Sequence, residues 1–171
     1  MTILIKGGHV INPATQMDEV ADVLIEDQKI KKIGKELPEK EAERVINADG
    51  CYVMPGFIDM HVHLESETGP GSYLNGFTFN PADYAFQSVM FAEKTLMSGF
   101  TAVRDLGGTN VNIALRNAIN KGWVVGPRVY TAGKSLASTG GHADPTNNYR
   151  KDLMGDPGPK EEIGRASCRE R

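Results

Sequence analysis

The periodicity of apolar and polar positions changes near residue 55 of the chain. Before it, short apolar runs are separated by turn residues, and the pair Asp27-Gln28 between two of these runs predicts a β-hairpin. Strands are expected at residues 3–6, 20–26, 29–33, 44–48 and 52–54. They are too few to close a β-sandwich by themselves, so the edges of their sheet would need partners.

From residue 56 onward, strands and helices are expected to alternate. The pair Asn80-Pro81 suits the start of a helix and Gly99 its end, and a second helix should close at Gly122. Further strands are expected at residues 100–105 and 128–132. Alternation of this kind builds a parallel sheet or barrel with right-handed crossovers, so the predicted fold class is α/β.

The segment 55–63 ends a short apolar run with the pattern His-x-His. Side chains two apart on a strand share a face, so His61 and His63 should point the same way, and by spacing Asp59 with them. Neutral imidazole is a common ligand of zinc. The pair therefore predicts a metal site, with Asp59 interpreted as a structural acid. The alternative is two histidines on the polar face of a strand.

The surroundings of this pair favour the metal hypothesis. Phe57, Ile58 and Met60 are expected in the core, and the next helical pattern starts only at Asn80. Residues 64–79 are therefore expected to form a long loop rich in Gly, Ser and Glu. Long ordered loops at the end of a strand tend to be functional.

Composition narrows the class of protein. Of the 171 residues, 40% are hydrophobic and 24% charged, and the net charge of −3 gives no reason to expect nucleic acid or a membrane surface as a partner. No apolar run is long enough to span a bilayer, and the first residues do not form a secretory signal, so a cytoplasmic protein is expected. The two cysteines make no disulfide framework.

The last residues, 162–171, break the composition of what precedes them. They resemble an in-frame translation of a sequencing adapter, and we expect them to be a non-native tail on a truncated copy of a longer protein. The alternative is a short, basic, solvated C-terminus.

Short strands followed by Pro-Gly-Phe-Ile-Asp-Met-His-Val-His at 55–63 resemble the opening of the amidohydrolase superfamily. Residues 99–108, 126–133 and 138–145 are most similar to its imidazolonepropionase-like, Xaa-Pro dipeptidase-type hydrolases. The resemblance spans residues 2–161 and implies the N-terminal part of a (β/α)8 TIM barrel preceded by part of a small β-sandwich domain. It implies a partial sandwich at 1–55 and about three βα units of the barrel at 56–161.

The resemblance also implies roles for three histidines. His61 and His63 match metal ligands, and His142 matches a residue that binds the substrate and polarises its carbonyl. By itself, a histidine in a loop such as 134–160 is more often solvated. The implied cofactor is a divalent metal, with zinc the first choice and one or two ions in the full-length enzyme. The other parts of the family site are a carboxylated lysine, two further histidines and a catalytic aspartate. They have no counterpart before residue 161, so no catalytic residue is assigned within this chain.

The implied reaction is hydrolysis of a C–N bond by a metal-bound hydroxide. The expected partner is a small molecule or dipeptide, ranked as X-Pro or an acyl-amino acid first, a cyclic amide of the imidazolonepropionase type second, and deamination of a purine or pyrimidine third. Glu65 stands where the dihydroorotase type carries an arginine, which argues against that reaction. Asp105, at the end of a strand, is interpreted as an ordinary turn acid.

Two further possibilities concern the polypeptide as a whole. The full-length enzyme could form a homo-oligomer. A different class of function is an inert fragment with weak metal binding and no turnover, because two histidines do not complete a catalytic zinc site.

Overall fold

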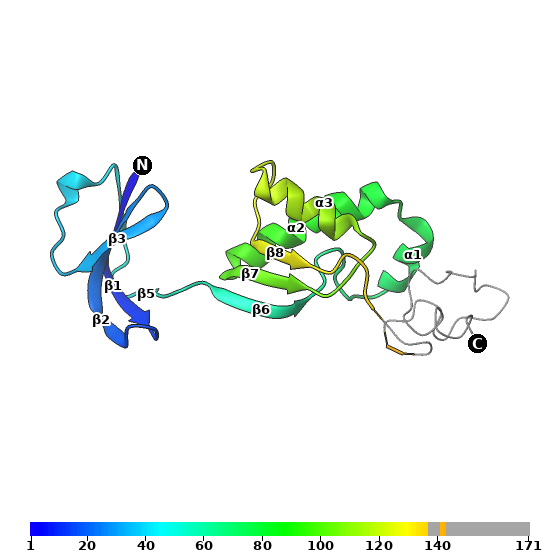
Figure 1. Cartoon of the computed structure of the whole chain (residues 1–171), viewed down its shortest axis with the longest axis horizontal. Helices are drawn as coiled ribbons and strands as arrows, with labels where there is room; N and C mark the ends of the chain where they lie inside the picture. Colours follow the sequence, from blue (N-terminus) through cyan, green and yellow to red (C-terminus); the bar gives the residue numbers. More distant parts are fainter. Residues whose placement is uncertain (137–140, 143–171) are drawn as a thin grey trace, which may run out of the picture. The chain divides into compact units, whose positions relative to one another are not determined.

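The computed structural model describes residues 1–136 and 141–142. Two compact units follow one another along the chain, Met1–Pro55 and a second that begins at Gly56 (Figure 1). The expected tail at 162–171 lies outside the described residues, as does most of the loop expected at 134–160.

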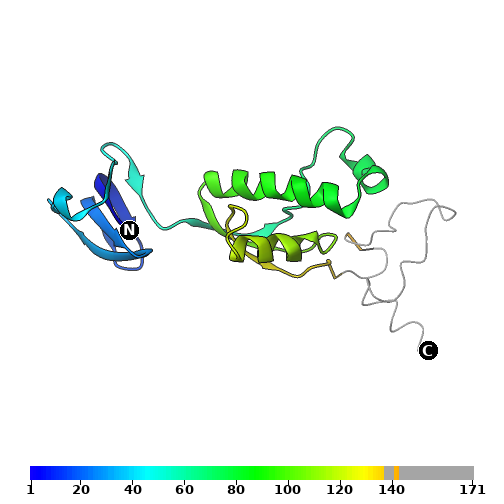
Figure 2. The ribbon, with the colours of Figure 1, turned by 90° about the horizontal axis from the view of Figure 1, so that it is seen from above.

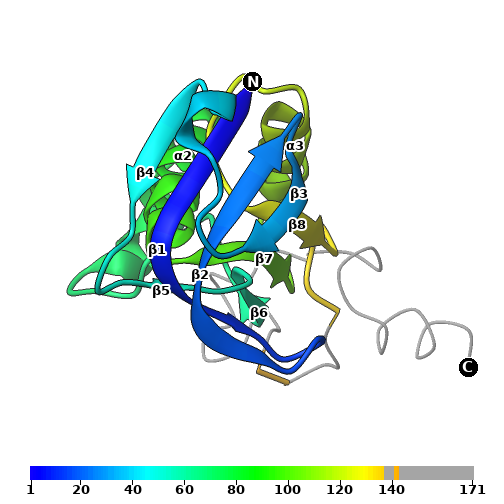
Figure 3. The same cartoon turned by 90° about the vertical axis from the view of Figure 1, so that its left-hand side faces the viewer.

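The first unit is one five-stranded sheet. Its elements are β1 (Thr2–Asn12), β2 (Met17–Glu26), β3 (Lys29–Gly34), the 3-10 turn η1 (Glu39–Glu41), β4 (Arg44–Asn47) and β5 (Tyr52–Val53). Figure 3 shows β1 between β2 and β4. β2 runs antiparallel to β1 and to β3, whereas β4 and β5 both pair in parallel with β1.

The hairpin predicted between β2 and β3 is confirmed. Asp27 and Gln28 have φ values of 48° and 66°, the positive pair that a type I′ turn requires. The first strand is longer than the expected 3–6, because it continues through an irregularity between Ile5 and Gly8. Gly7 has a φ of +72°, which lets the strand bend and continue.

A buried carboxylate braces this irregularity. Asp22 is only 5% exposed, and its neighbours on β2, Ala21 and Val23, belong to a small cluster of buried aliphatic side chains. Its Oδ1 accepts the N–H of Gly7 at 2.8 Å, and its Oδ2 accepts the N–H of Leu37 at 2.9 Å. Asp22 therefore ties the bend of β1 to the segment after β3.

The second unit has the predicted alternation of strands and helices. Its elements are β6 (Phe57–Val62), η2 (Ser72–Leu74), α1 (Asn75–Thr78), α2 (Pro81–Met97), β7 (Phe100–Asp105), α3 (Val111–Asn120) and β8 (Arg128–Thr131). The strands are parallel in the order β6-β7-β8. α2 and α3 lie side by side on one face of this sheet, as Figure 2 shows. The parallel sheet confirms the predicted α/β class.

Local signals place α2 where the sequence predicted it. Asn80 is the N-cap, and its backbone N–H donates to the Asp83 carboxylate at 2.8 Å in a capping box. Gly99 has a φ of +95°, as expected for a residue that stops a helix. The buried core under the helices consists of Leu64, Ala92, Val103, Leu115 and Val129.

Two expectations were wrong. Phe57, Ile58 and Met60 are 52%, 66% and 59% exposed rather than in the core, because β6 is an edge strand and the helices cover only one face of the sheet. The segment 64–79 was expected to contain no helix, yet it includes η2 and α1. Single helical turns are too short to produce a periodic apolar pattern.

None of the helices in the described part of the chain has the length and apolar character that a membrane span requires.

We predict that Asp22→Ala destabilises the first unit by about 2–4 kcal/mol, because it leaves two buried N–H groups without their charged acceptor. Faster hydrogen exchange in peptides that contain Gly7 and Leu37, together with a lower urea midpoint, would show this. Asp49→Ala removes an exposed carboxylate from the same unit and should change stability by less than about 0.5 kcal/mol. Unchanged exchange in Asp22→Ala would contradict the bracing role.

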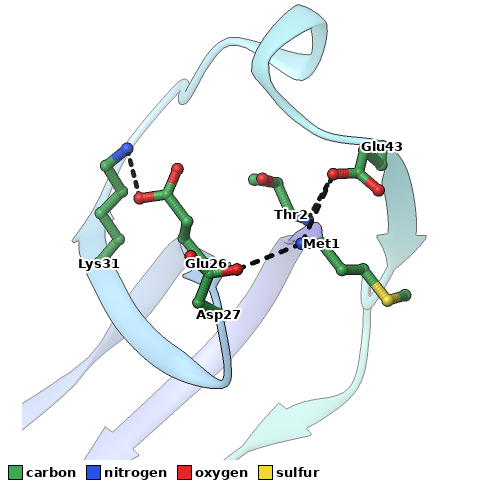
Figure 4. Close-up of polar contacts among 6 residues, drawn as sticks. All are labelled: Met1, Thr2, Glu26, Asp27, Lys31 and Glu43. Carbon is green, nitrogen blue, oxygen red and sulfur yellow. Dashed lines mark hydrogen bonds and ion pairs between the residues drawn. The ribbon is translucent and has the colours of Figure 1, made fainter.

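The chain's amino group is paired with two carboxylates (Figure 4). The Met1 nitrogen lies 3.3 Å from Asp27 Oδ1 and 3.7 Å from Glu43 Oε1. The hydrogen bond to Asp27 and the charge of Glu43 raise the pKa of this amino group above its ordinary value of 8.0. Because the folded pKa is the higher one, the contribution to stability is complete below pH 8 and is lost as the pH rises through the folded pKa.

We therefore expect Asp27→Asn to lower the pKa of the Met1 amino group toward 8.0. The pH dependence of its acetylation rate measures this. Asp49→Asn, which removes an exposed charge without touching Met1, is the control. Equal pKa values in the wild type and Asp27→Asn would contradict the assignment.

Candidate metal centre

β6 delivers the two predicted histidines to the end of the sheet at which β7 also ends. His61 and His63 are both exposed, and their ring centroids lie 5.5 Å apart with the planes at 75°. Nδ1 of His63 is 2.7 Å from the carbonyl oxygen of Gly107, which can only accept. Nδ1 of His63 is therefore the donor, and in the neutral ring Nε2 keeps a lone pair for a ligand.

An irregularity in β6 separates the histidines from Asp59. Asp59 pairs with Val103 and Val62 with Asp105, so three steps along β6 match two along β7. Asp59 therefore shares a face with Val62, and both line one cavity together with His63. Its carboxylate accepts the backbone N–H of His61 at 2.9 Å, which supports the structural interpretation.

A fully buried carboxylate lies behind the histidines. Asp105 Oδ2 accepts the N–H of Leu64 at 3.0 Å. Its Oδ1 accepts the N–H of Gly107 and the side-chain amide of Asn112, both at 3.0 Å. Interpreting Asp105 as an ordinary turn acid missed this network. The signal available in the sequence was its place at the end of a strand of the parallel sheet, where barrel enzymes put functional groups.

Glu65 is the second acid of this network and is 4% exposed. Its two oxygens accept the N–H groups of Thr109 and Asn112, each at 2.6 Å, at the start of α3. A carboxylate is favourable there because it complements the helix dipole. Both oxygens are committed to the backbone, so Glu65 carries no information on how a substrate carboxylate is bound.

A cavity of about 270 Å³ opens beside His63. It is lined by His63, Glu65, Ser66, Ser72, Asn75, Tyr84 and residues 107–109. Apart from Glu65 and His63, these groups are uncharged and able to form hydrogen bonds. The segment 64–79, predicted as a functional loop, thus forms one wall of a cavity next to His63.

The role of the third candidate stays a prediction of the sequence. His142 is exposed and lies in a short described stretch between two segments that are not described. Within the described part of the chain, no three His, Cys, Asp or Glu side chains gather closely enough to hold a metal.

His61 and His63 fit a divalent metal as part of its ligand set. Two neighbouring imidazoles, one of them oriented by a carbonyl through Nδ1, are the donors that zinc and similar ions prefer. A catalytic zinc takes three protein ligands, so these two would need at least one more.

Comparison with known proteins reveals the family. The profile of the Amidohydrolase family matches residues 52–168. Dihydroorotase from Trichlorobacter lovleyi is 50% identical over 64 residues, which are 37% of this chain and 15% of that enzyme. Dihydroorotase from Clostridioides difficile is 39% identical over 108 residues, 63% of this chain and 23% of that enzyme.

Solved structures give a second group of relatives. A Xaa-Pro dipeptidase with bound methionine is 33% identical, with a TM-score of 0.82 over 96% of this chain and 41% of that one. Ochratoxinase of A. niger is 28% identical, with a TM-score of 0.69 over 91% of this chain and 36% of that one. The chain spans less than half the length of each of these four relatives.

These matches confirm the resemblance to the amidohydrolase superfamily that the motifs indicated. They also confirm the expected fold, the N-terminal part of a barrel of parallel βα units. A family match over more than half of its residues, together with a parallel sheet that ends in a histidine pair, shows that the chain belongs to the amidohydrolase family.

Proposed function

We propose that this chain supplies the first two ligands, His61 and His63, of a divalent-metal site in an enzyme that hydrolyses amide C–N bonds. The observation that carries the proposal is the hydrogen bond from His63 Nδ1 to the Gly107 carbonyl, because it leaves Nε2 of an exposed ring available beside a second imidazole. The proposed metal is zinc, as one or two ions.

The chemistry follows from this arrangement. When bound, the cation acts as a Lewis acid, which acidifies water and polarises a carbonyl. His61 and His63 hold one side of it, and the cavity beside His63 receives part of the substrate. His142 is proposed to bind the substrate near its carbonyl.

The substrate belongs to one of two amide classes. The similarity to a Xaa-Pro dipeptidase over nearly the whole chain supports a dipeptide. The sequence similarity to dihydroorotases supports a cyclic amide just as well. The ranking of dipeptides above cyclic amides therefore has no support. The boundaries 1–55 and 56–161, a cytoplasmic location and a homo-oligomer stay predictions of the sequence.

A second candidate function is metal binding without turnover. It is favoured by the two-histidine set, since the chain has only four histidines, and His9 lies in the first unit, paired with Asp18 at 2.5 Å. Both candidates share the same pair of ligands, so metal binding is tested first and turnover second.

We predict that the chain binds Zn²⁺ in calorimetric titration and that His61→Ala and His63→Ala each weaken binding at least about tenfold, because each removes one of two ligands. His9→Ala is the matched control and should leave the affinity unchanged. Equal affinities in all four proteins would mean that zinc binds elsewhere and would contradict the site.

We further predict that the zinc-loaded 171-residue chain hydrolyses neither an X-Pro dipeptide nor dihydroorotate above the protein-free rate, because two histidines leave the ligand set incomplete. The same two substrates, tested on the product of the gene sequenced onward from codon 162, would separate the amide classes. A zinc-dependent rate from the 171-residue chain would contradict the prediction. No rate from the longer product on either substrate would contradict both proposed classes.

A further inference from the structure

The carboxylate of Asp105 holds both partners of the hydrogen bond that orients His63. One oxygen accepts the N–H of Leu64, directly after His63, and the other accepts the N–H of Gly107, the residue whose carbonyl receives the imidazole proton. The strands β6 and β7 are parallel, so these two segments leave the sheet at the same end (Figure 1). Because a carboxylate is rigid and this one is fully buried, it fixes how far the end of β6 lies from the loop after β7.

Asn112, the second residue of α3, holds that carboxylate in place. Its side chain is fully buried, and Nδ2 donates to Asp105 Oδ1 at 3.0 Å and to the carbonyl of Gly133 at 2.9 Å. Both neighbours can only accept, so the orientation of the amide is determined. Its backbone N–H is held in turn by Glu65.

The peptide unit between Gly107 and Gly108 is fixed at both ends. Its carbonyl accepts from His63 Nδ1, and its N–H, that of Gly108, donates to the Gly133 carbonyl at 2.8 Å. Gly107 has a φ of +144°, which side chains rarely allow. A Cβ on Gly108 would lie 2.5 Å from the carboxyl carbon of Glu65. The acceptor of the His63 proton is therefore part of a tightly built loop and not a mobile carbonyl.

We propose that Asp105, braced by Asn112, is a positioning residue that keeps His63 in the Nδ1–H tautomer and directs its Nε2 toward the cation site. The part that concerns the cation rests on the proposed function. The part that concerns the tautomer does not, because it follows from the hydrogen bonds of the metal-free chain. Glu65 acts one step further away, by holding the start of α3 that carries Asn112.

The test is Asp105→Asn in the 171-residue chain, read by the ¹⁵N shifts of the His63 ring in the metal-free, neutral form. In the wild type we expect the proton on Nδ1. In Asp105→Asn, one N–H donor faces an amide NH₂ in place of an oxygen, so His63 should populate both tautomers, and Zn²⁺ affinity should fall about 10–100-fold. The control is Asp22→Asn, the same change to a buried aspartate that also accepts two backbone N–H groups, but in the first unit. It should leave the tautomer and the zinc affinity unchanged.

A folded Asp105→Asn chain in which His63 keeps the Nδ1 proton would overturn the proposal. If Asp105→Asn does not fold, Asn112→Ala decides, because it removes only the brace and leaves the bonds of Asp105 to the backbone in place. A shift toward the second tautomer in Asn112→Ala supports the positioning role, and an unchanged tautomer overturns it. A wild-type chain that shows the Nδ1 proton but binds no Zn²⁺ would support the positioning of the ring and overturn the proposed metal function.

Discussion

Two buried carboxylates, on Asp105 and Glu65, hold the described part of the second unit together at the end where the histidines lie. Burying a charge is costly unless hydrogen bonds compensate for it, and here each of the four oxygens accepts at least one N–H. Those N–H groups belong to the segment after β6, the loop after β7 and the start of α3. The two carboxylates therefore connect the segments at this end of the sheet, and the histidines lie on the framework that these hydrogen bonds form.

This frame explains why an open three-stranded sheet can present an ordered pair of imidazoles. The apolar core lies between the helices and one face of the sheet, and it does not reach His61 or His63. Exposed side chains are normally free to rotate. His63 is not, because its proton is held by a carbonyl whose peptide unit is itself fixed at both ends.

The family of the chain and the substrate of the enzyme depend on different parts of the structure. Membership of the amidohydrolase family depends on motifs that fold locally, and these are present along residues 52–168. Choice of substrate depends on side chains that several loops bring together, and in the described part of the chain the segment after β6 and the loop after β7 line the cavity beside His63. A Xaa-Pro dipeptidase and dihydroorotases both appear among the relatives.

The sequence by itself determined the elements whose signals are local: the turn at Asp27-Gln28, the cap at Asn80, and the alternation that gives a parallel sheet. It also predicted that the rings of His61 and His63 lie next to each other, because side chains two apart are neighbours on an extended strand. Only the tertiary structure decided that the register shifts between Asp59 and Val62, because such a shift depends on the partner strand. It also decided that Asp105 and Glu65 are buried acids that accept N–H groups from distant segments. The cost of burying a charge depends on N–H groups more than forty positions away, as in the bond from Leu64 to Asp105, and no pattern within one segment records them.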